Sequence, residues 1–189
     1  MTAAIAIAGV RWGRVARHAD ARGAFREVWR DSAFPELTPD LTGGQAARFV
    51  QANISSSAAG VLRGLHYHRR QLDHWIVLDG RAFVALVDIR PTASGARPVV
   101  DTRELGADET VTIPVGVAHG FLALTDLTLM YLVTNEYDGS DELGFRWDDS
   151  WAGVPWPTVA SSPDGRPILS ERDQKNPSLR TLLETLQRG

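Results

Sequence analysis

A chain of 189 residues, with 43% hydrophobic and 23% charged residues, is long enough to bury one sizeable core and has the composition of a soluble globular protein. Its formal net charge of -3 argues against a nucleic-acid partner, and the absence of cysteine excludes disulfides, thiolate metal sites and cysteine nucleophiles. No apolar run approaches the ~18 residues that a membrane helix needs. We therefore expect a single domain over residues 1–189, located in the cytoplasm, with no membrane or nucleic-acid partner.

Short apolar segments separated by Gly, Asp, Pro and Ser recur along most of the chain and predict β-strands. The apolar run at residues 1–10 has no positive charge before it, so we interpret it as a first strand and not as a signal peptide. Strands of the observed length and spacing are typical of a β-sandwich or barrel. Further strands are predicted at 24–30, 47–55, 74–80, 81–90, 109–116 and 127–137.

The predicted strand at 81–90 differs from its neighbours because apolar residues occupy both of its faces. We expect it to be covered on both sides, by a second sheet or by a partner subunit. Asp79 and Gly80 lie between this strand and the one before it, which is a strong signal for a β-hairpin.

The C-terminal part of the chain has a different pattern. Residues 151–175 are rich in Pro and Ser and are expected to form an irregular strap over the β-sheets. One helix follows, because Asn176 can cap it, Pro177 suits its first turn, and leucines recur at helical spacing. These leucines are Leu179, Leu182, Leu183 and Leu186.

Polar side chains recur with a period of two, which places them on one face of a strand. The pairs are Gln51 with Asn53, His66 with His68, and Tyr131 with Tyr137. Any one of these residues is more often an isolated polar group with a satisfied hydrogen bond. Because burying several polar groups is costly unless they are used or paired, the set predicts a common interior that holds a small ligand.

A metal site is one interpretation of the histidines. Metal-binding barrels of the cupin class use a His-x-His motif, a later acidic residue and a histidine in a PxGxxH element. The corresponding residues here are His66, His68, Asp73 and His119, the last in "PVGVAH" at 114–119. Three imidazoles and a carboxylate would suit Fe, Mn, Ni or Zn. Many barrels of this class lack the ligands, so the pattern indicates the fold more strongly than the metal.

Several longer segments resemble one family. They are "GVLRGLHYH", "VALVDIRPT", "IPVGVAHGFLAL", "MYLVTNEY", "FRWDDSWAGVPWP" and "LSERD", in this order. Together they resemble the dTDP-4-dehydrorhamnose 3,5-epimerase (RmlC-like) family over roughly residues 10–180. The resemblance implies an all-β cupin jelly-roll barrel with a short C-terminal helix. It also implies a homodimer, often one that exchanges N-terminal strands.

The chemistry that the resemblance implies is epimerisation of a nucleotide-linked 4-keto-6-deoxyhexose, such as a dTDP sugar, in deoxysugar biosynthesis. The C4 ketone acidifies the hydrogens at C3 and C5, so a base can form an enolate that an acid reprotonates on the opposite face, with no metal or organic cofactor. By resemblance His66 is the base, which suits a histidine near neutral pH. Asp173 orients it, as in the His–Asp half of a catalytic triad. Tyr131 returns the proton.

The resemblance also implies residues that bind the substrate. Arg22 and Arg63 match arginines that hold its phosphates or sugar, and guanidinium groups suit a pyrophosphate. The other matching residues, at the nucleotide, the sugar or the cavity wall, are Glu27, Gln51, Asn53, His119 and Tyr137.

Two departures from the family lie close to the predicted base. His68 stands where the family has Gln, and Asp73 or His74 stands where it has the Lys that stabilises the enolate oxygen. Loss of such a donor is serious, since one contributes ~10²–10³ in rate. A protonated His74 or His68, or Arg70, could replace the lysine, but a carboxylate would repel the enolate. We therefore count His68 and His74 among the substrate-binding candidates.

These departures leave three functions open. The chain could be a specialised epimerase that inverts only C3 or only C5. It could be an isomerase or cyclase acting on a substrate that is not a nucleotide sugar, which the lost lysine and the changed segment at 91–98 favour. It could also be a metal-binding cupin.

Overall fold

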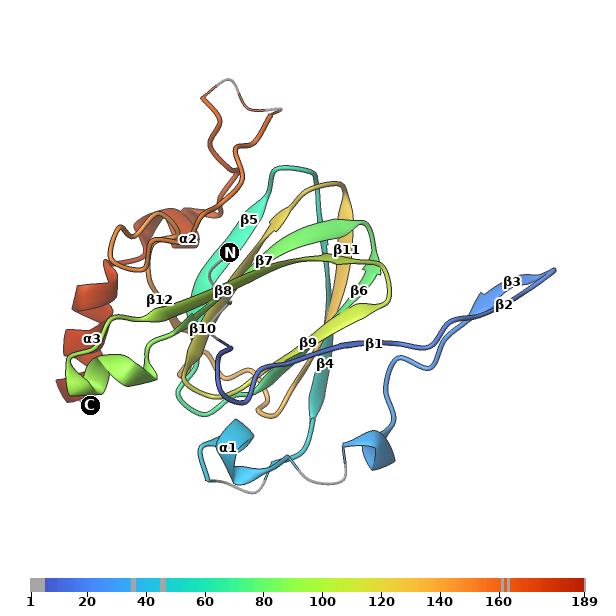
Figure 1. Ribbon diagram of the computed structural model, residues 1–189, viewed down its shortest axis with the longest axis horizontal. Helices are drawn as coiled ribbons and strands as arrows, with labels where there is room; N and C mark the ends of the chain where they lie inside the picture. Colours follow the sequence, from blue (N-terminus) through green and yellow to red (C-terminus); the bar gives the residue numbers. More distant parts are fainter. Residues whose placement is uncertain (1–5, 35–36, 45–46, 161, 163, 189) are drawn as a thin grey trace.

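Two five-stranded antiparallel sheets that face each other form the body of the protein (Figure 1). The computed structural model describes residues 6–34, 37–44, 47–160, 162 and 164–188. The first sheet contains, in order, β1 (Arg11–Arg14), β9 (Glu109–Ile113), β6 (Asp73–Asp79), β11 (Leu127–Val133) and β4 (Gln51–Ser57). The second contains β12 (Leu143–Gly144), β5 (Leu62–Tyr67), β10 (Val117–Ala123), β7 (Arg81–Asp88) and β8 (Val99–Gly106). This arrangement confirms the predicted all-β jelly-roll architecture.

The remaining elements are short and lie outside the two sheets. A two-stranded ribbon, β2 (His18–Asp20) and β3 (Gly23–Phe25), extends away from the body as an arm (Figure 1). The helices are η1 (Asp31–Ala33), α1 (Pro39–Thr42), η2 (Arg90–Ser94), α2 (Glu171–Lys175) and α3 (Leu179–Arg188). Within the described ranges, none of these helices has the length and apolar character required to cross a membrane.

The main core fills the space between the two sheets, because alternate side chains of each strand point inward. It includes Val84, Leu86 and Phe121 from the second sheet and Val77, Val111 and Leu129 from the first. Each such side chain is almost fully buried, and burial of one stabilises the fold by about 1.5–3 kcal/mol.

Strand β7 is covered on both faces, as its apolar pattern predicts. Val84 and Leu86 belong to the core between the sheets, whereas Ala85 and Val87 pack on the outer side. The outer cover is the C-terminal segment of the same chain, including Leu179 of α3. The first sheet and the C-terminal segment thus provide the two covers, and no partner subunit is needed to explain the pattern.

Leu179 gives a direct measure of this outer packing, since its side chain is 0% exposed. We expect Leu179→Ala to lower the free energy of unfolding by about 2–5 kcal/mol, because the substitution leaves a cavity under α3. Urea denaturation measures the change. The exposed Gln187→Ala in the same helix is the control and should change it by less than about 0.5 kcal/mol. Equal effects of the two substitutions would contradict the packing that we describe.

The predicted hairpin at Asp79 and Gly80 is wrong. Strand β6 pairs with β9 and β11, whereas β7 pairs with β8 and β10, so the turn carries the chain from one sheet to the other. Gly80 has φ +85°, and a Cβ there would lie 2.0 Å from the carbonyl oxygen of Asp126. The glycine is needed because this turn, which connects the two sheets, packs closely against another loop. Such a turn has the same local sequence as a hairpin turn, so the sequence alone did not distinguish them.

Several further boundaries differ from the predictions. The predicted strand at 47–55 is β4, which begins at Gln51, and those at 109–116 and 127–137 end at Ile113 and Val133. The first strand begins at Arg11, and the described part of the predicted strand at 1–10 is not extended into a sheet; residues 1–5 lie outside the described residues. Of the predicted strand at 24–30, only the first residues belong to β3. Ser178, and not Asn176, caps the C-terminal helix, since the Ser178 Oγ accepts the Thr181 N–H at 3.2 Å.

Candidate active site

A cavity of about 510 Å³ lies between the two sheets. Polar side chains from β4, β5, β6, β10 and β11 project into it, so the period-two pattern correctly predicted a shared polar interior. Its lining from the first sheet comprises Gln51, Asn53, Ser55, Asp73, Trp75, Leu129, Tyr131 and Val133. The rest comprises Arg63, His66, His68, Gln71, His119, Phe121, Tyr137, Glu142, Ser170, Arg172 and Asp173.

His66 and Asp173 form a hydrogen-bonded pair at this cavity. The His66 Nε2 lies 2.9 Å from the Asp173 Oδ1, and because a carboxylate accepts, the Nε2 carries the proton. The other ring nitrogen, Nδ1, is then the unprotonated one. Asp173 is 3% exposed, and burial would raise its pKa. The hydrogen bond and charge of His66, the Gly64 N–H and the charge of Arg172 together outweigh burial and hold the pKa below its usual value. The carboxylate therefore stays ionised beside the imidazole at neutral pH.

Asp173 is held in place from two sides. The Gly64 N–H donates to its Oδ2 at 3.4 Å. Its own N–H donates to the Oγ of Ser170, the N-cap of α2, at 3.0 Å. The short helix thus presents the carboxylate to β5, although 107 residues separate it from His66 in the chain.

Close contact between β5 and β10 fixes the backbone that carries His66. Gly64 has φ +134°, and a Cβ on it would lie 2.6 Å from the Cα of Gly120. Only glycine allows this approach. His66 and His119 are register partners across the same pair of strands. The "RGLH" and "AHGF" segments are therefore one structural unit.

Tyr131 reaches the cavity from the opposite sheet. It lies on β11, between Asn53 of β4 and Trp75 of β6. Burial, followed by the charge of the Asp73 carboxylate, raises the pKa of the Tyr131 phenol. The hydroxyl therefore carries its proton at neutral pH, and it faces a cavity whose other wall presents His66.

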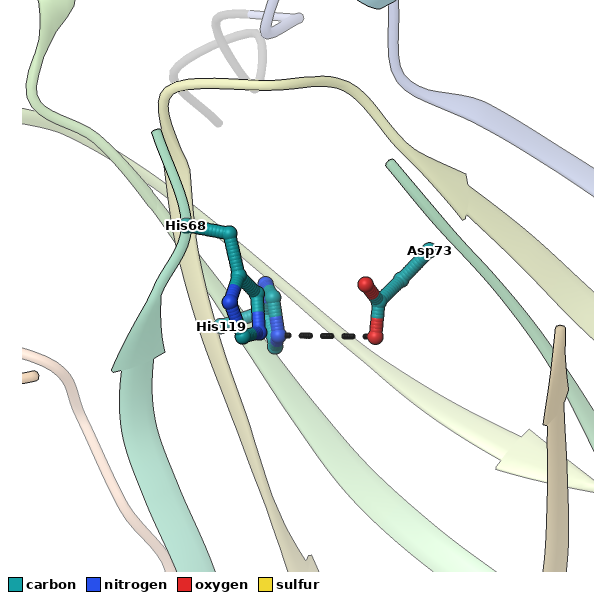
Figure 2. Close-up of side chains that lie close together, drawn as sticks. All are labelled: His68, Asp73 and His119. Atoms are coloured by element: carbon teal, nitrogen blue, oxygen red, sulfur yellow. Dashed lines mark ion pairs between the residues drawn. The ribbon is translucent and has the colours of Figure 1, made fainter. Parts of the chain in front are cut away.

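Asp73, His68 and His119 form a second polar group in the same cavity (Figure 2). The His119 Nε2 lies 3.7 Å from the Asp73 Oδ2. Burial, only partly opposed by Asp73, lowers the pKa of His119 to about 4. His119 is therefore neutral at pH 7, and its approach to Asp73 is not an ion pair between two charged groups.

His74 does not face the cavity. Its side chain lies on the other face of β6, where its Nδ1 is 2.8 Å from the Thr112 Oγ1 and its ring centroid is 5.0 Å from that of Phe34. Burial lowers its pKa to about 4, so it is neutral. Of the two residues at which the resemblance places the family's lysine, Asp73 is therefore the one that faces the cavity.

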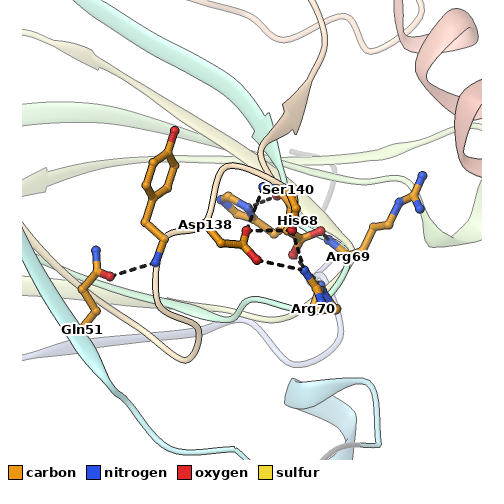
Figure 3. A network of polar contacts seen from close by, with 8 residues as sticks. Gln51, His68, Arg69, Arg70, Asp138 and Ser140 are labelled. Carbon is orange, nitrogen blue, oxygen red and sulfur yellow. Dashed lines mark hydrogen bonds and ion pairs between the residues drawn. The ribbon is translucent and has the colours of Figure 1, made fainter.

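The loop that follows β11 holds His68 and the turn after it in place through hydrogen bonds (Figure 3). The His68 Nδ1 lies 2.6 Å from the Asp141 carbonyl oxygen, and the backbone N–H groups of Arg69 and Arg70 each donate to the Asp141 carboxylate at 2.9 Å. The Arg70 side chain donates to the Ser140 Oγ and does not line the main cavity. Of the three candidates for replacing the lysine, only His68 borders the cavity.

The structure also separates Arg22 and Glu27 from the cavity of their own chain. Arg22 is exposed at the tip of the β2–β3 arm and donates to the Asp20 carboxylate. Glu27 follows the arm and pairs with Arg30 at 2.5 Å. Neither residue approaches the described cavity residues of the same chain.

The remaining predicted residues lie in the cavity wall. The Gln51 Nε2 donates to the Asn53 Oδ1 at 2.9 Å. The Gln51 Oε1 accepts the Tyr137 N–H at 2.9 Å (Figure 3). The Arg63 Nε donates to the Ser57 Oγ at 3.0 Å.

Glu142 and Arg172 also line the cavity, and sequence reasoning did not select them. They form an ion pair, and the Tyr137 hydroxyl donates to Glu142 at 3.2 Å. The available signal for Arg172 was its position in "LSERD", directly before Asp173. Glu142 lies in a loop without a recognisable pattern.

The fold and the cavity together define a cupin-type jelly roll with an acid–base centre, in which a histidine–carboxylate pair faces a protonated tyrosine. The dTDP-4-dehydrorhamnose 3,5-epimerase family matches residues 4–181 of this chain. The chain belongs to this family.

Individual relatives agree with this assignment. The dTDP-4-dehydrorhamnose 3,5-epimerase of Escherichia coli K12 is 35% identical over 162 residues, which cover 82% of each chain. The structure of the rmlC epimerase of Mycobacterium tuberculosis is similar with a TM-score of 0.77 and 34% identity, covering 94% of this chain and 87% of that one. ChmJ, a 3'-monoepimerase from Streptomyces bikiniensis solved with dTDP-quinovose, has a TM-score of 0.76 and 28% identity, covering 96% and 89%.

Proposed function

We propose that this protein is an epimerase that inverts C3, C5 or both in a nucleotide-linked 4-keto-6-deoxyhexose during deoxysugar biosynthesis. The observation that carries the proposal is the His66–Asp173 pair, which faces Tyr131 across one cavity. Membership of the family and the similarity to ChmJ support the substrate class. A cytoplasmic location is part of the proposal.

The geometry suits removal of a proton next to the C4 ketone. The His66 Nδ1 is free to take the proton because Nε2–H is bound to Asp173, and the ionised carboxylate stabilises the imidazolium that forms. Tyr131, on the facing sheet, then delivers a proton to the opposite face of the enolate. In this proposal Arg63 binds the phosphates or the sugar, and Gln51 and Asn53 contact the substrate from β4.

Incubation with dTDP-4-keto-6-deoxyglucose in deuterated water tests the proposal. We expect deuterium at C3, C5 or both, since proton abstraction exchanges these positions with solvent. Mass spectrometry and NMR locate the label. Absence of deuterium at both carbons would contradict the proposal for this substrate.

The second candidate is an isomerase or cyclase with a substrate that is not a nucleotide sugar. The specific observation that favours it is a carboxylate, Asp73, facing the cavity where the family has a lysine. Thermal unfolding with dTDP separates the two functions. A nucleotide-sugar enzyme should gain about 2.7 kcal/mol at a dTDP concentration 100 times its Kd, whereas no stabilisation would favour the second candidate.

Tyr131→Phe should separate the two proton transfers. Loss of the hydroxyl removes the proposed acid, so we expect epimer formation to fall about 10²–10⁴-fold while His66 still exchanges the hydrogen that it abstracts. Tyr67→Phe is the matched control, because Tyr67 packs against the outer core and lies outside the main cavity. If Tyr131→Phe lost deuterium exchange and epimer formation equally, Tyr131 would not be the acid that returns the proton.

A homodimer that exchanges N-terminal arms is also part of the proposal. Arg22 and Glu27 cannot serve their own cavity, and the arm region exposes large apolar side chains, with Phe25 68% and Trp29 41% exposed. Edge strand β4 adds Ile54, which is 64% exposed. Contact between an arm and a second copy would bury these groups and bring the arm close to the partner's cavity. Sedimentation equilibrium would measure the mass, and a monomer at micromolar concentration would contradict the dimer.

A further inference from the structure

Three side chains in the cavity converge as a set of metal ligands would. His68, Asp73 and His119 each offer one ligand atom, and these atoms all lie within 4.8 Å of one another (Figure 2). They come from the turn after β5, from β6 and from β10, so both sheets contribute. Asp73 and His119 are 4% exposed, and His68 is partly buried. The cluster is therefore an interior feature and not a chance group of surface side chains.

The hydrogen bonds of the two histidines leave the same ring nitrogen available in each. The His68 Nδ1 donates to the Asp141 carbonyl oxygen at 2.6 Å, and the His119 Nδ1 donates to the Val117 carbonyl oxygen at 3.2 Å. In both rings the Nε2 is therefore the atom with the lone pair. Histidines that bind metals usually donate the other ring N–H to a carbonyl or carboxylate in this way, which fixes the tautomer and the ring orientation.

Asp73 is oriented in a similar way. The Gln71 Nε2 donates to its Oδ1 at 2.8 Å, and the Trp75 Nε1 donates to its Oδ2 at 3.1 Å. Each carboxylate oxygen keeps a second lone pair. Ligand atoms on one metal ion lie ~3.0–3.4 Å apart for bonds of ~2.1 Å, so the 3.7 Å between the Asp73 Oδ2 and the His119 Nε2 needs only a small inward movement.

The carboxylate also lacks a cation of its own. Among the ion pairs of the described residues, Asp73 is paired only with His119, and no arginine or lysine is paired with it. Of the two arginines that line the cavity, Arg63 donates to Ser57 and Ser56, and Arg172 is paired with Glu142. A buried carboxylate without a cation is costly, and a divalent ion would remove that cost.

We propose that His68, Asp73 and His119 bind one divalent first-row transition-metal ion. Two imidazoles and one carboxylate are a donor set that such ions accept with further positions open to a ligand. His66 is outside this set, since the group whose ligand atoms lie within 4.8 Å of one another does not include it. The role of the ion rests on the proposed epimerase function: its charge would face the C4 oxygen of the substrate, where the family has a lysine.

The departures from the family have a single explanation under this proposal. Asp73 replaces the lysine, and His68 replaces the glutamine, while the histidine at position 119 is shared. Either change alone would remove a polar contact. Together they complete a ligand set around the position that lost its positive charge.

Isothermal titration calorimetry with Co²⁺, on untagged protein freed of metal by a chelator, tests the site without reference to activity. We expect one ion per chain, and at least ~100-fold weaker binding for His68→Gln and for Asp73→Asn. His18→Gln, an exposed histidine on the arm, is the control and should bind as the unaltered protein does. Thermal unfolding in chelator checks that each variant is folded. If Asp73→Asn does not fold, His68→Gln still tests the site, because His68 is partly exposed and its substitution should disturb the fold less. Absence of Co²⁺ binding, or unchanged binding by both variants, would overturn the site.

A double variant that restores the family's residues, His68→Gln with Asp73→Lys, tests the role of the ion. We expect deuterium exchange by the unaltered protein to fall at least ~10²-fold in chelator and to return with Co²⁺, whereas the double variant should exchange equally with and without chelator. Undiminished exchange by the unaltered protein in chelator would overturn the role at the C4 oxygen. Absence of deuterium exchange in both proteins, with chelator and with Co²⁺, would contradict the proposed epimerase function instead. The metal site itself is decided by calorimetry alone.

Discussion

Replacement of His66 by alanine is expected to reduce deuterium exchange into the substrate by about 10³-fold or more. The expected loss lies within the 10²–10⁴-fold range of a general base, because the variant retains no group at the Nδ1 position that could take the proton. Asp173 would remain nearby, but it lies behind the imidazole and is 3% exposed. Mass spectrometry of the nucleotide sugar after incubation in deuterated water measures the rate.

Controls for this substitution concern folding and substrate binding. The His66 side chain is 24% exposed at the cavity wall, so its removal should change the thermal midpoint little. Binding of dTDP should also be retained, because the nucleotide part of the substrate does not depend on the base. Exchange at the original rate in a folded, dTDP-binding variant would move the base to another residue.

Asp173→Asn is expected to lower the exchange rate about 10²–10⁴-fold with little change in the size of the side chain. The amide carries no charge to stabilise the imidazolium, and its NH₂ group can donate to the His66 Nε2. That hydrogen bond would favour the tautomer protonated at Nδ1, which cannot accept the substrate proton. Asp164→Asn, at an exposed position, is the control and should leave the rate unchanged. A rate loss smaller than tenfold would show that His66 does not need the carboxylate.

The same variant has an expected effect on stability against pH. The pKa of Asp173 is lowered in the folded protein, so its contribution to stability is present above its unfolded pKa of ~3.9 and is lost as the pH falls through the lower folded value. The unaltered protein should therefore lose stability below about pH 4 more steeply than Asp173→Asn does. Urea denaturation between pH 3 and pH 6 measures the difference, and parallel curves would contradict the lowered pKa.

Much of the β architecture could be predicted from local patterns. The apolar residues on both faces of 81–90 required two covers, and the structure provides them in the first sheet and in the C-terminal segment that includes α3. The period of two on β4 and β5 correctly placed polar groups in one interior, whereas Tyr137 follows the end of β11 and reaches the cavity from a loop. Both predictions hold because side-chain direction in a strand depends only on the position of each residue along it.

Other features depend on which strands pair, and local sequence does not contain that information. The Asp79–Gly80 turn matches a hairpin in composition, but β6 and β7 pair with strands elsewhere in the chain. The His66–Asp173 pair was expected from the family resemblance alone, because 107 residues separate its members and no pattern links them. Arg22 and Glu27 were expected at the site, but their arm extends away from it.

The sequence by itself determined the fold class, the family and the residue types available for proton transfer, because each follows from composition, period or a continuous motif. Only the tertiary structure decided that Asp73, and not His74, faces the cavity, since neighbouring residues of a strand point to opposite sides and the register with β9 and β11 chooses between them. It also brought His68 and His119 to Asp73, and left His66 outside that group, where it is hydrogen-bonded to Asp173. Contacts between distant segments make these choices, and they form only when both sheets are assembled.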